Sequence, residues 1–324
     1  MTKIRKKIHS LTLAMIAMGM VSAAIAEEPR GEIEPLYPRE LFSSPASYGA
    51  PLISPDGTMI SYVAIHEGGM NLWVAPLNNL DDAKPLTAEK RGVQFTDVSG
   101  NVIYRWTHDG KHLLYHVDTV GNERFELHRV NVRNGESEKI AVFNRRKTKL
   151  VQMNEDNPKE ILVHVNNGNA FNPHHYHKVN MKTGETTLVE RTDKFVGLIA
   201  DHALRPRIAI EIAPDGGWNL HKSQGDGNWE PMMQVSPEDT SALQNASYQR
   251  AFGFDRTNRF FYTYDSRGRN TAALVRYDMD TGEQKVLASD DRVDIGGVMF
   301  HPTTFEIQAY ATNWARLTWH ALDR

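Results

Sequence analysis

A glycine turn returns along this chain at a constant interval, and the interval limits the folds that the chain can adopt. Gly135 and Gly184 are separated by 49 residues, and Gly282 follows Gly184 by 98, which is twice that interval. A glutamate follows each of the three glycines. His128 and His177, which occupy matching positions in the preceding strands, are also 49 residues apart. This regularity indicates a chain built from repeated units.

Each unit starts with a tight turn and continues as short strands. The first turn is Ser-Pro-Asp-Gly at 54–57, in which proline fixes φ, aspartate offers a local hydrogen bond and glycine allows a positive φ. Residues 59–64 after it are apolar and β-branched, and 71–77 form the next expected strand. The turn returns as Thr-His-Asp-Gly at 107–110. Three to four strands are expected in each unit, with almost no helix.

Repeated four-stranded units of this length are typical of a β-propeller, whose blades stack because one blade cannot bury both of its faces. Tandem β-sandwich domains are the alternative, but each of them needs roughly 100 residues. We predict an all-β fold over 49–324, a β-propeller with four-stranded blades. Five blades are complete, and a partial sixth begins at Val298 and lacks its outer strand. This count predicts an open or incomplete ring of a seven-bladed fold.

Residues 1–26 have the three parts of a secretory signal peptide. A basic start precedes an apolar run over 11–21, and an Ala-x-Ala pattern ends at Ala26. The run is shorter than the ~20 apolar residues that span a bilayer. We predict cleavage between Ala26 and Glu27, a lead-in segment over 27–48, and a chain exported to the periplasm that is free of the membrane after cleavage.

The composition excludes several classes of function. The formal net charge of −3 argues against binding of nucleic acid or of an anionic membrane through the field of the whole chain. The chain contains no cysteine, which excludes disulfides, thiolate metal sites and a cysteine nucleophile. We expect no cofactor.

A histidine-rich stretch is the sharpest local cluster. His175 and His177 alternate along a predicted strand, so both can face one side and offer imidazole nitrogens to a divalent metal. The alternative is a blade strand that carries polar residues beside solvent. No cysteine or acidic residue lies nearby in the sequence to complete a set of ligands.

Several of these motifs together resemble a known family. The stretches 54–57, 71–74 and 106–111, with the repeated Gly-Glu turns, resemble the N-terminal propeller of exported prolyl-oligopeptidase-type serine peptidases, family S9. The similarity covers residues 36–324. The Pro-Asp-Gly repeat also occurs in propellers of the TolB type.

In the family, an α/β-hydrolase domain follows the propeller and carries a Gly-x-Ser-x-Gly nucleophile elbow, then Asp and His. The 324 residues contain no such motif, and the nearest stretch, at 135–139, lacks the second glycine. No catalytic residue is therefore assigned. We expect a propeller truncated before the catalytic domain and inactive by itself.

The resemblance leaves two functions open. In the first, the propeller gates substrates of an S9-type serine peptidase: it admits peptides through its channel to a hydrolase domain that cleaves peptide bonds. In the second, it is a stand-alone periplasmic TolB-like propeller that acts as a protein-interaction scaffold. Expected partners are peptides, the hydrolase domain, and further copies of the chain through the open edge of the last blade.

Overall fold

The computed structural model describes most of the chain after residue 46. The described residues are 37–39, 47–97, 102–140, 143, 147–153, 156–166, 173–248, 253–301 and 303–322. The predicted signal peptide, its cleavage site at Ala26 and Glu27, and nearly all of the lead-in segment 27–48 lie outside them. The chain divides into two units, Met1–Ala46 and Ser47–Arg324.

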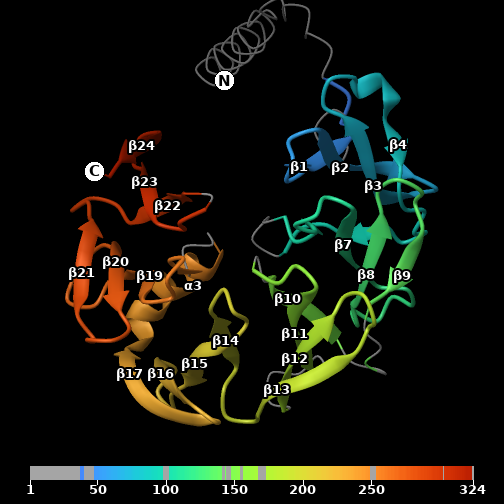
Figure 1. Cartoon of the computed structure of the whole chain (residues 1–324). Helices are drawn as coiled ribbons and strands as arrows, with labels where there is room; N and C mark the ends of the chain where they lie inside the picture. The colour runs from blue at the N-terminus through green and yellow to red at the C-terminus, as the bar shows by residue number, and fades with distance from the viewer. Residues whose placement is uncertain are drawn as a thin grey trace, which may run out of the picture. The chain divides into compact units, whose positions relative to one another are not determined.

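The second unit consists of six antiparallel sheets, which follow one another in chain order (Figure 1). The first contains β1 Tyr48–Ile53, β2 Met59–His66, β3 Gly69–Pro76 and β4 Lys84–Pro85. The second contains β5 Val93–Gln94, β6 Arg105–Trp106, β7 His112–Val117, β8 Glu126–Asn131 and β9 Ser137–Lys139. The third contains β10 Lys147–Met153, β11 Glu160–Asn166, β12 His174–Asn180 and β13 Thr186–Thr192.

The fourth sheet contains β14 Gly197–Ala200, β15 Pro206–Ile212, β16 Trp218–Gly225 and β17 Asn228–Val235. The fifth contains β18 Gly253–Phe254, β19 Phe260–Asp265, β20 Ala273–Asp278 and β21 Gln284–Ala288. The sixth contains β22 Ile295–Phe300, β23 Ile307–Asn313 and β24 Leu317–Ala321. Short helical segments also occur: η1 Leu80–Asp82, η2 Pro237–Asp239 and α3 Thr240–Tyr248. Within the described ranges, no helix is long and apolar enough to cross a membrane.

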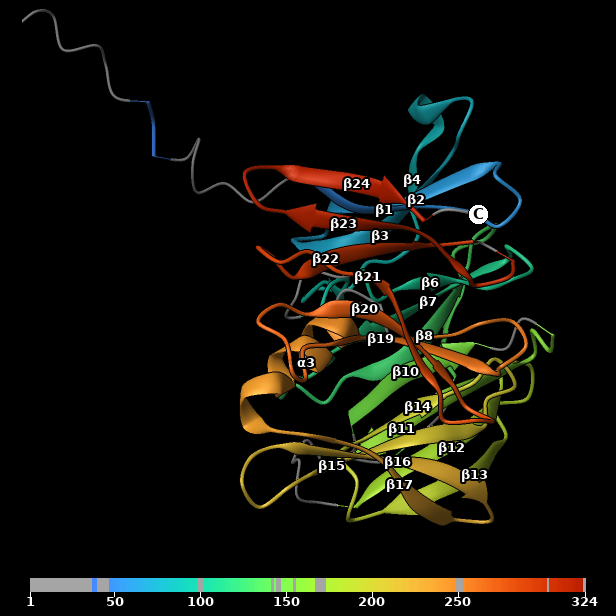
Figure 2. The ribbon, with the colours of Figure 1, turned by 90° about the vertical axis from the view of Figure 1, so that its left-hand side faces the viewer.

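The sheets are the blades of a propeller. In Figure 1 the first strand of each blade lies toward the middle of the ring and the last strand lies toward the outside. Figure 2 shows the blades from the side, with α3 at one face of the ring. The predicted all-β propeller is therefore confirmed.

The number of blades corrects the sequence prediction. The structure has six blades, where the sequence predicted five complete blades and a partial sixth of a seven-bladed fold. The sixth unit forms a sheet of its own, in which β22, β23 and β24 are paired within the described residues. Ile295 and Ile307 from this sheet are buried against the fifth blade, so packing on a neighbour completes it as a blade.

The second blade also differs from the expected four strands. Both β5 and β6 pair with β7, one at each end of it. The inner strand is thus split into two short pieces, β5 and β6. No local pattern in the sequence marked this departure.

The repeat of 49 residues has a physical basis in one turn. Asn131, Asn180 and Asp278 each end the third strand of a blade, and the side chain of each accepts hydrogen bonds from backbone N–H groups two and three residues later. The glycine four residues on has a φ of 72° to 76° and donates its N–H to the backbone carbonyl of the same Asn or Asp at 2.8 Å. Only glycine adopts this φ without strain, which is why it recurs.

Adjacent blades are joined by buried apolar clusters. One cluster lies between each pair of consecutive blades, so there are five along the ring. Between the second and third blades, for example, Leu114 and Leu127 pack against Ile161 and Val163. Strand alternation produces this arrangement, because successive side chains point to opposite faces of a sheet and so to the two neighbouring blades.

Basic side chains also tie one blade to the next. Lys84 of the first blade donates to the backbone carbonyl of Arg133 in the second at 2.8 Å. Arg129 of the second blade donates to the carbonyl of Met181. Lys222 of the fourth donates to the carbonyl of Met279. Each contact satisfies a carbonyl beside the repeated glycine turn, so the turn is also a docking point between blades.

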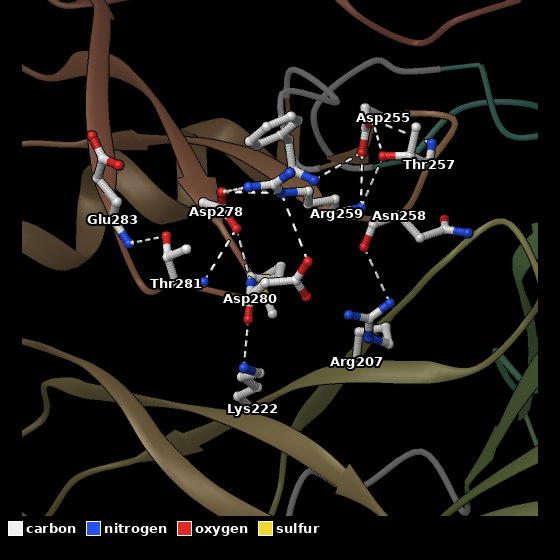
Figure 3. A network of polar contacts seen from close by, with 12 residues as sticks. Arg207, Lys222, Asp255, Thr257, Asn258, Arg259, Asp278, Asp280, Thr281 and Glu283 are labelled. Carbon is white, nitrogen blue, oxygen red and sulfur yellow. Dashed lines mark hydrogen bonds and ion pairs between the residues drawn. The ribbon is translucent and has the colours of Figure 1, made fainter.

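Figure 3 shows this junction between the fourth and fifth blades. Arg207 donates to the backbone carbonyl of Asn258 at 3.2 Å. Within the fifth blade Arg259 contacts Asp278 through two nitrogens, at 2.6 and 3.1 Å. The hydrogen bond from Arg259 lowers the pKa of Asp278 to about 2.

Asn71 is a buried polar side chain that joins β3 to the segment before β5. Its Nδ2 donates to the carbonyls of His66 and Glu89 at 2.8 and 3.1 Å. Its Oδ1 accepts from the hydroxyl of Thr87 and the N–H of Glu89, both at 2.8 Å. The side chain is fully buried, so these bonds have no replacement from water.

We expect Asn71→Ala to lower the free energy of unfolding by about 3 kcal/mol, because the buried hydroxyl of Thr87 and partly buried backbone groups lose their partners. Asn79→Ala is the matched control. Asn79 lies on the surface and contacts Asp82, and we expect its loss to cost less than about 0.5 kcal/mol. Urea unfolding followed by tryptophan fluorescence measures both. Equal midpoints for the two variants would contradict the role given to Asn71.

Candidate functional site

A pocket of about 390 Å³ lies at the inner edge of the second blade. Its walls come from β5 and the residues around it, and from the connection between β7 and β8. The lining residues are Arg91, Gly92, Val93, Gln94, Phe95, Thr96, Asp118 and Phe125. The pocket therefore combines apolar side chains with a cation, an anion and neutral polar groups.

A close approach of two backbones positions the first wall. A Cβ on Gly69 would lie 2.6 Å from the backbone nitrogen of Gly92, and a Cβ on Gly92 would lie 2.8 Å from the carbonyl oxygen of Met70. Neither distance is tolerated, so both positions require glycine. With the hydrogen bonds of Asn71 to Glu89, this contact fixes the turn that carries Arg91.

The second wall is a loop organised by Asp118. Its carboxylate accepts hydrogen bonds from four backbone N–H groups, those of Val120, Gly121, Asn122 and Glu123, at 2.7 to 3.3 Å. Partial desolvation raises the pKa of Asp118, but the hydrogen bonds outweigh it and hold the pKa below its usual range. The backbone N–H groups of the loop thus supply the hydrogen-bond donors that this carboxylate requires.

Two basic side chains border the pocket. Arg91 is exposed and lies across the loop, where its guanidinium covers Gly121. The ammonium of Lys147, from β10 of the third blade, lies 5.1 Å from the ring centroid of Phe125. The backbone N–H of Thr148 donates to the carbonyl of Phe125 at 2.9 Å, which holds β10 beside the pocket wall.

A buried histidine lies behind this wall. His116, on β7 opposite Gln94, accepts a hydrogen bond at Nε2 from the N–H of Leu150 at 3.2 Å. Its Nδ1 is buried and has no hydrogen-bond partner in the described part of the chain. Burial, with a smaller contribution from the charges of Lys149 and Arg105, lowers the pKa of His116 to about 4. The imidazole is therefore neutral at neutral pH.

The structure places His175 and His177 side by side on β12. Their rings stack with centroids 6.2 Å apart, and His177 also contacts Phe143 at 4.9 Å. The predicted alternation on one face of the strand is thus confirmed. In the described residues no group of three or more His, Cys, Asp or Glu side chains could hold a metal ion. The sequence assigned no metal site and named this pair only as its candidate, and that assignment stays a prediction.

The opposite face of the same strand holds a histidine pair that the sequence analysis missed. His174 Nδ1 lies 2.7 Å from Nε2 of His164, on the neighbouring strand β11. Tyr176 stacks on His164 at 4.8 Å. The pKa of His164 is lowered to about 3, mainly by burial and secondly by the electrostatic effect of His174. His164 is therefore neutral at neutral pH and shares a hydrogen bond with His174, in the face that packs toward the fourth blade.

Sequence reasoning also missed the residues of the pocket. Asp118, Thr119 and Gly121 form a stretch typical of a side-chain-capped turn, which was the available signal. Arg91 and Phe125 carried no local signal, because the contact between their segments depends on how β5 pairs with β7.

Comparison with known proteins relates the chain to peptidases. No protein-family model matches it. It is 31% identical over 291 residues to dipeptidyl aminopeptidase BIII of Pseudoxanthomonas mexicana, which covers 88% of this chain and 40% of that protein. It is 23% identical over 283 residues to dipeptidyl peptidase family member 6 of Caenorhabditis elegans, which covers 83% of this chain and 36% of that protein. The chain spans about two fifths of the length of these relatives.

Three solved structures with similar folds have low sequence identity to this chain. An oligogalacturonate lyase in complex with manganese has a TM-score of 0.58 at 14% identity, covering 86% of this chain and 78% of the other. A prolyl endopeptidase has a TM-score of 0.57 at 12% identity, and the match covers 85% of this chain and 41% of the other. The propeller domain of the Trilobed protease from Pyrococcus furiosus has a TM-score of 0.51 at 15% identity, and the match covers 86% of this chain and 82% of the other. These likenesses show the fold alone.

The neutral state of His116 predicts a pH dependence of stability. Its pKa in the folded chain, about 4, is below its ordinary value of 6.5, so the unfolded chain binds the proton more tightly. Its contribution is complete above pH 6.5 and is lost as the pH falls toward 4, by up to about 3 kcal/mol. We expect His116→Gln to lose less stability than the wild type over this range.

Urea unfolding of both proteins at a series of pH values measures this difference. Above pH 6.5, the difference in free energy of unfolding between wild type and variant reflects the altered contacts alone, and it serves as the internal control. Parallel stability curves for wild type and variant down to pH 4 would show that His116 is not a neutral buried group.

Proposed function

Because this chain is a homologue of the S9-type dipeptidyl peptidases over most of its length, we propose that it is the non-catalytic, substrate-gating propeller of such an enzyme. The match to dipeptidyl aminopeptidase BIII, 31% identity over 88% of this chain, is the observation that carries the proposal. Peptides pass the inner strands of the blades on their way to a hydrolase domain. The proposed activity of the parent enzyme is hydrolysis of peptide bonds.

The geometry supports a peptide as the ligand. The pocket opens at the inner edge of a blade, where Gln94 and Thr96 offer polar groups and Phe125 offers an apolar wall. Clefts of about 300–1,000 Å³ with a few fixed polar groups are typical of ligand sites. The absence of a Gly-x-Ser-x-Gly motif from the 324 residues supports a chain that does not cleave peptides by itself.

The second candidate is a stand-alone TolB-like scaffold, and the position of the bound ligand separates the two. A gating propeller binds a short unstructured peptide at the inner strands, which include β1, β10, β14 and β22. A scaffold binds a folded partner on the outside of the ring, at strands such as β13 and β17. We further propose that the chain acts after export to the periplasm, following cleavage between Ala26 and Glu27.

We expect hydrogen–deuterium exchange with added peptide to show protection at inner strands, the pocket wall around Asp118 included, and no change at β13 and β17. Mass spectra of the same samples are expected to show intact peptide. Protection confined to the outer strands would favour the scaffold. Cleavage of the peptide would contradict the non-catalytic role, provided that a mock purification from the same host shows none.

We also propose that the chain self-associates through the sixth blade. Met299, Leu317 and Trp319 lie on its face away from the fifth blade and are about half exposed, at 52%, 57% and 49%. In the described residues β24 pairs only with β23, so its other edge carries unpaired backbone groups. A flat, apolar strand edge is a template for pairing with another chain.

We expect light scattering after size-exclusion chromatography to give a mass that rises with concentration. Trp319→Ser removes the largest apolar side chain of this face and is expected to shift the protein toward monomer. Val120→Ser, at an exposed position on the second blade, is the matched control and is expected to leave the mass unchanged. A monomer at all concentrations in the wild type would contradict the proposal.

A further inference from the structure

Two cations border the pocket of the second blade without an ion-pair partner among the described residues: Arg91 in its lining and Lys147 beside Phe125. The carboxylate that lines the pocket, Asp118, already accepts four backbone hydrogen bonds. Charges left without a partner at the border of a pocket favour an anionic ligand.

Glu126, which directly follows Phe125, is also occupied. Its carboxylate pairs with Lys139 at 2.6 Å and lies 3.4 Å from His128. Partial desolvation raises the pKa of Glu126, but the bonds to Lys139 and His128 outweigh it and keep the group ionised. It therefore cannot turn to neutralise the cations of the pocket without breaking both contacts.

The guanidinium of Arg91 is exposed and lies against the backbone of the loop. A Cβ on Gly121 would lie 2.5 Å from one of its nitrogens and 2.7 Å from its central carbon, so the plane of the group rests directly on the backbone of the loop. Gly121 has a φ of 75°, which glycine adopts without strain. Its planar fork of donors matches the two oxygens of a carboxylate.

We propose that this pocket is a subsite for a carboxylate group of the bound peptide, with Arg91 as the anchor. The proposal rests on the function proposed above and names the substrate class for it. Lys147 adds a second charge at the opposite wall, beside Phe125. The apolar ring and the neutral Gln94 and Thr96 suit a peptide better than a small inorganic anion, which would need polar contacts on every side. The carboxylate belongs to the C-terminus or to an acidic side chain.

Fluorescence anisotropy with labelled short peptides tests this subsite. Peptides that differ only in a free or amidated C-terminus form one pair, and peptides with an internal Glu or Gln form the second. We expect the wild type to prefer the carboxylate member of one pair by about tenfold, the scale of a bidentate contact with arginine. The pair that shows the preference identifies the source of the carboxylate.

Arg91→Gln is expected to abolish this preference, and Arg91→Lys to retain only part of it, because an ammonium keeps the charge without the fork. Lys182→Gln is the control: it removes one positive charge from the exposed turn between β12 and β13, and we expect the preference to survive. Circular dichroism confirms that each variant is folded.

The outcomes separate this proposal from the proposed function. If both members of each pair bind equally to the wild type, the peptide function stands and the carboxylate subsite is wrong. The subsite is also wrong if Arg91→Gln leaves the preference intact, or if Lys182→Gln removes it equally. If no peptide binds at all, the gating function fails as well.

Discussion

Burial of apolar side chains between neighbouring blades is the interaction on which the rest of this structure depends. A single blade cannot bury both of its faces by itself, and here each pair of consecutive blades shares one buried cluster. Contacts such as that of Lys84 with the carbonyl of Arg133 then fix how far one blade turns relative to the next. The inner edges are positioned by this packing, and the pocket with them.

The architecture followed from the sequence because it is encoded locally. Asn131 and Gly135 specify a turn through their own side-chain and backbone chemistry, so its repetition revealed the blades. The sixth blade was underestimated, because the burial of Ile295 and Ile307 depends on a neighbour that local patterns do not describe. Local sequence patterns therefore predict turns well, but they predict less well which strands pack into a complete blade.

The candidate site could not be predicted from local sequence patterns either, because it also depends on contacts between distant segments. Arg91 meets Gly121 only because β5 pairs with β7 in one register, and Lys147 reaches Phe125 only because the third blade packs on the second. The alternation of His175 and His177 was visible in the sequence, whereas the pair on the other face needed the partner His164 from the adjacent strand. Sites built across strands and blades require the register, which a single sequence does not contain.

The contact between the guanidinium of Arg91 and the backbone of Gly121 has a consequence for the thermodynamics of binding. A surface arginine usually loses side-chain rotational entropy when it grips a ligand, and this loss offsets much of the contact. Here contact with the loop restricts part of that rotation before any ligand arrives. The entropic penalty on the protein side is therefore smaller than for an arginine that extends freely into solvent.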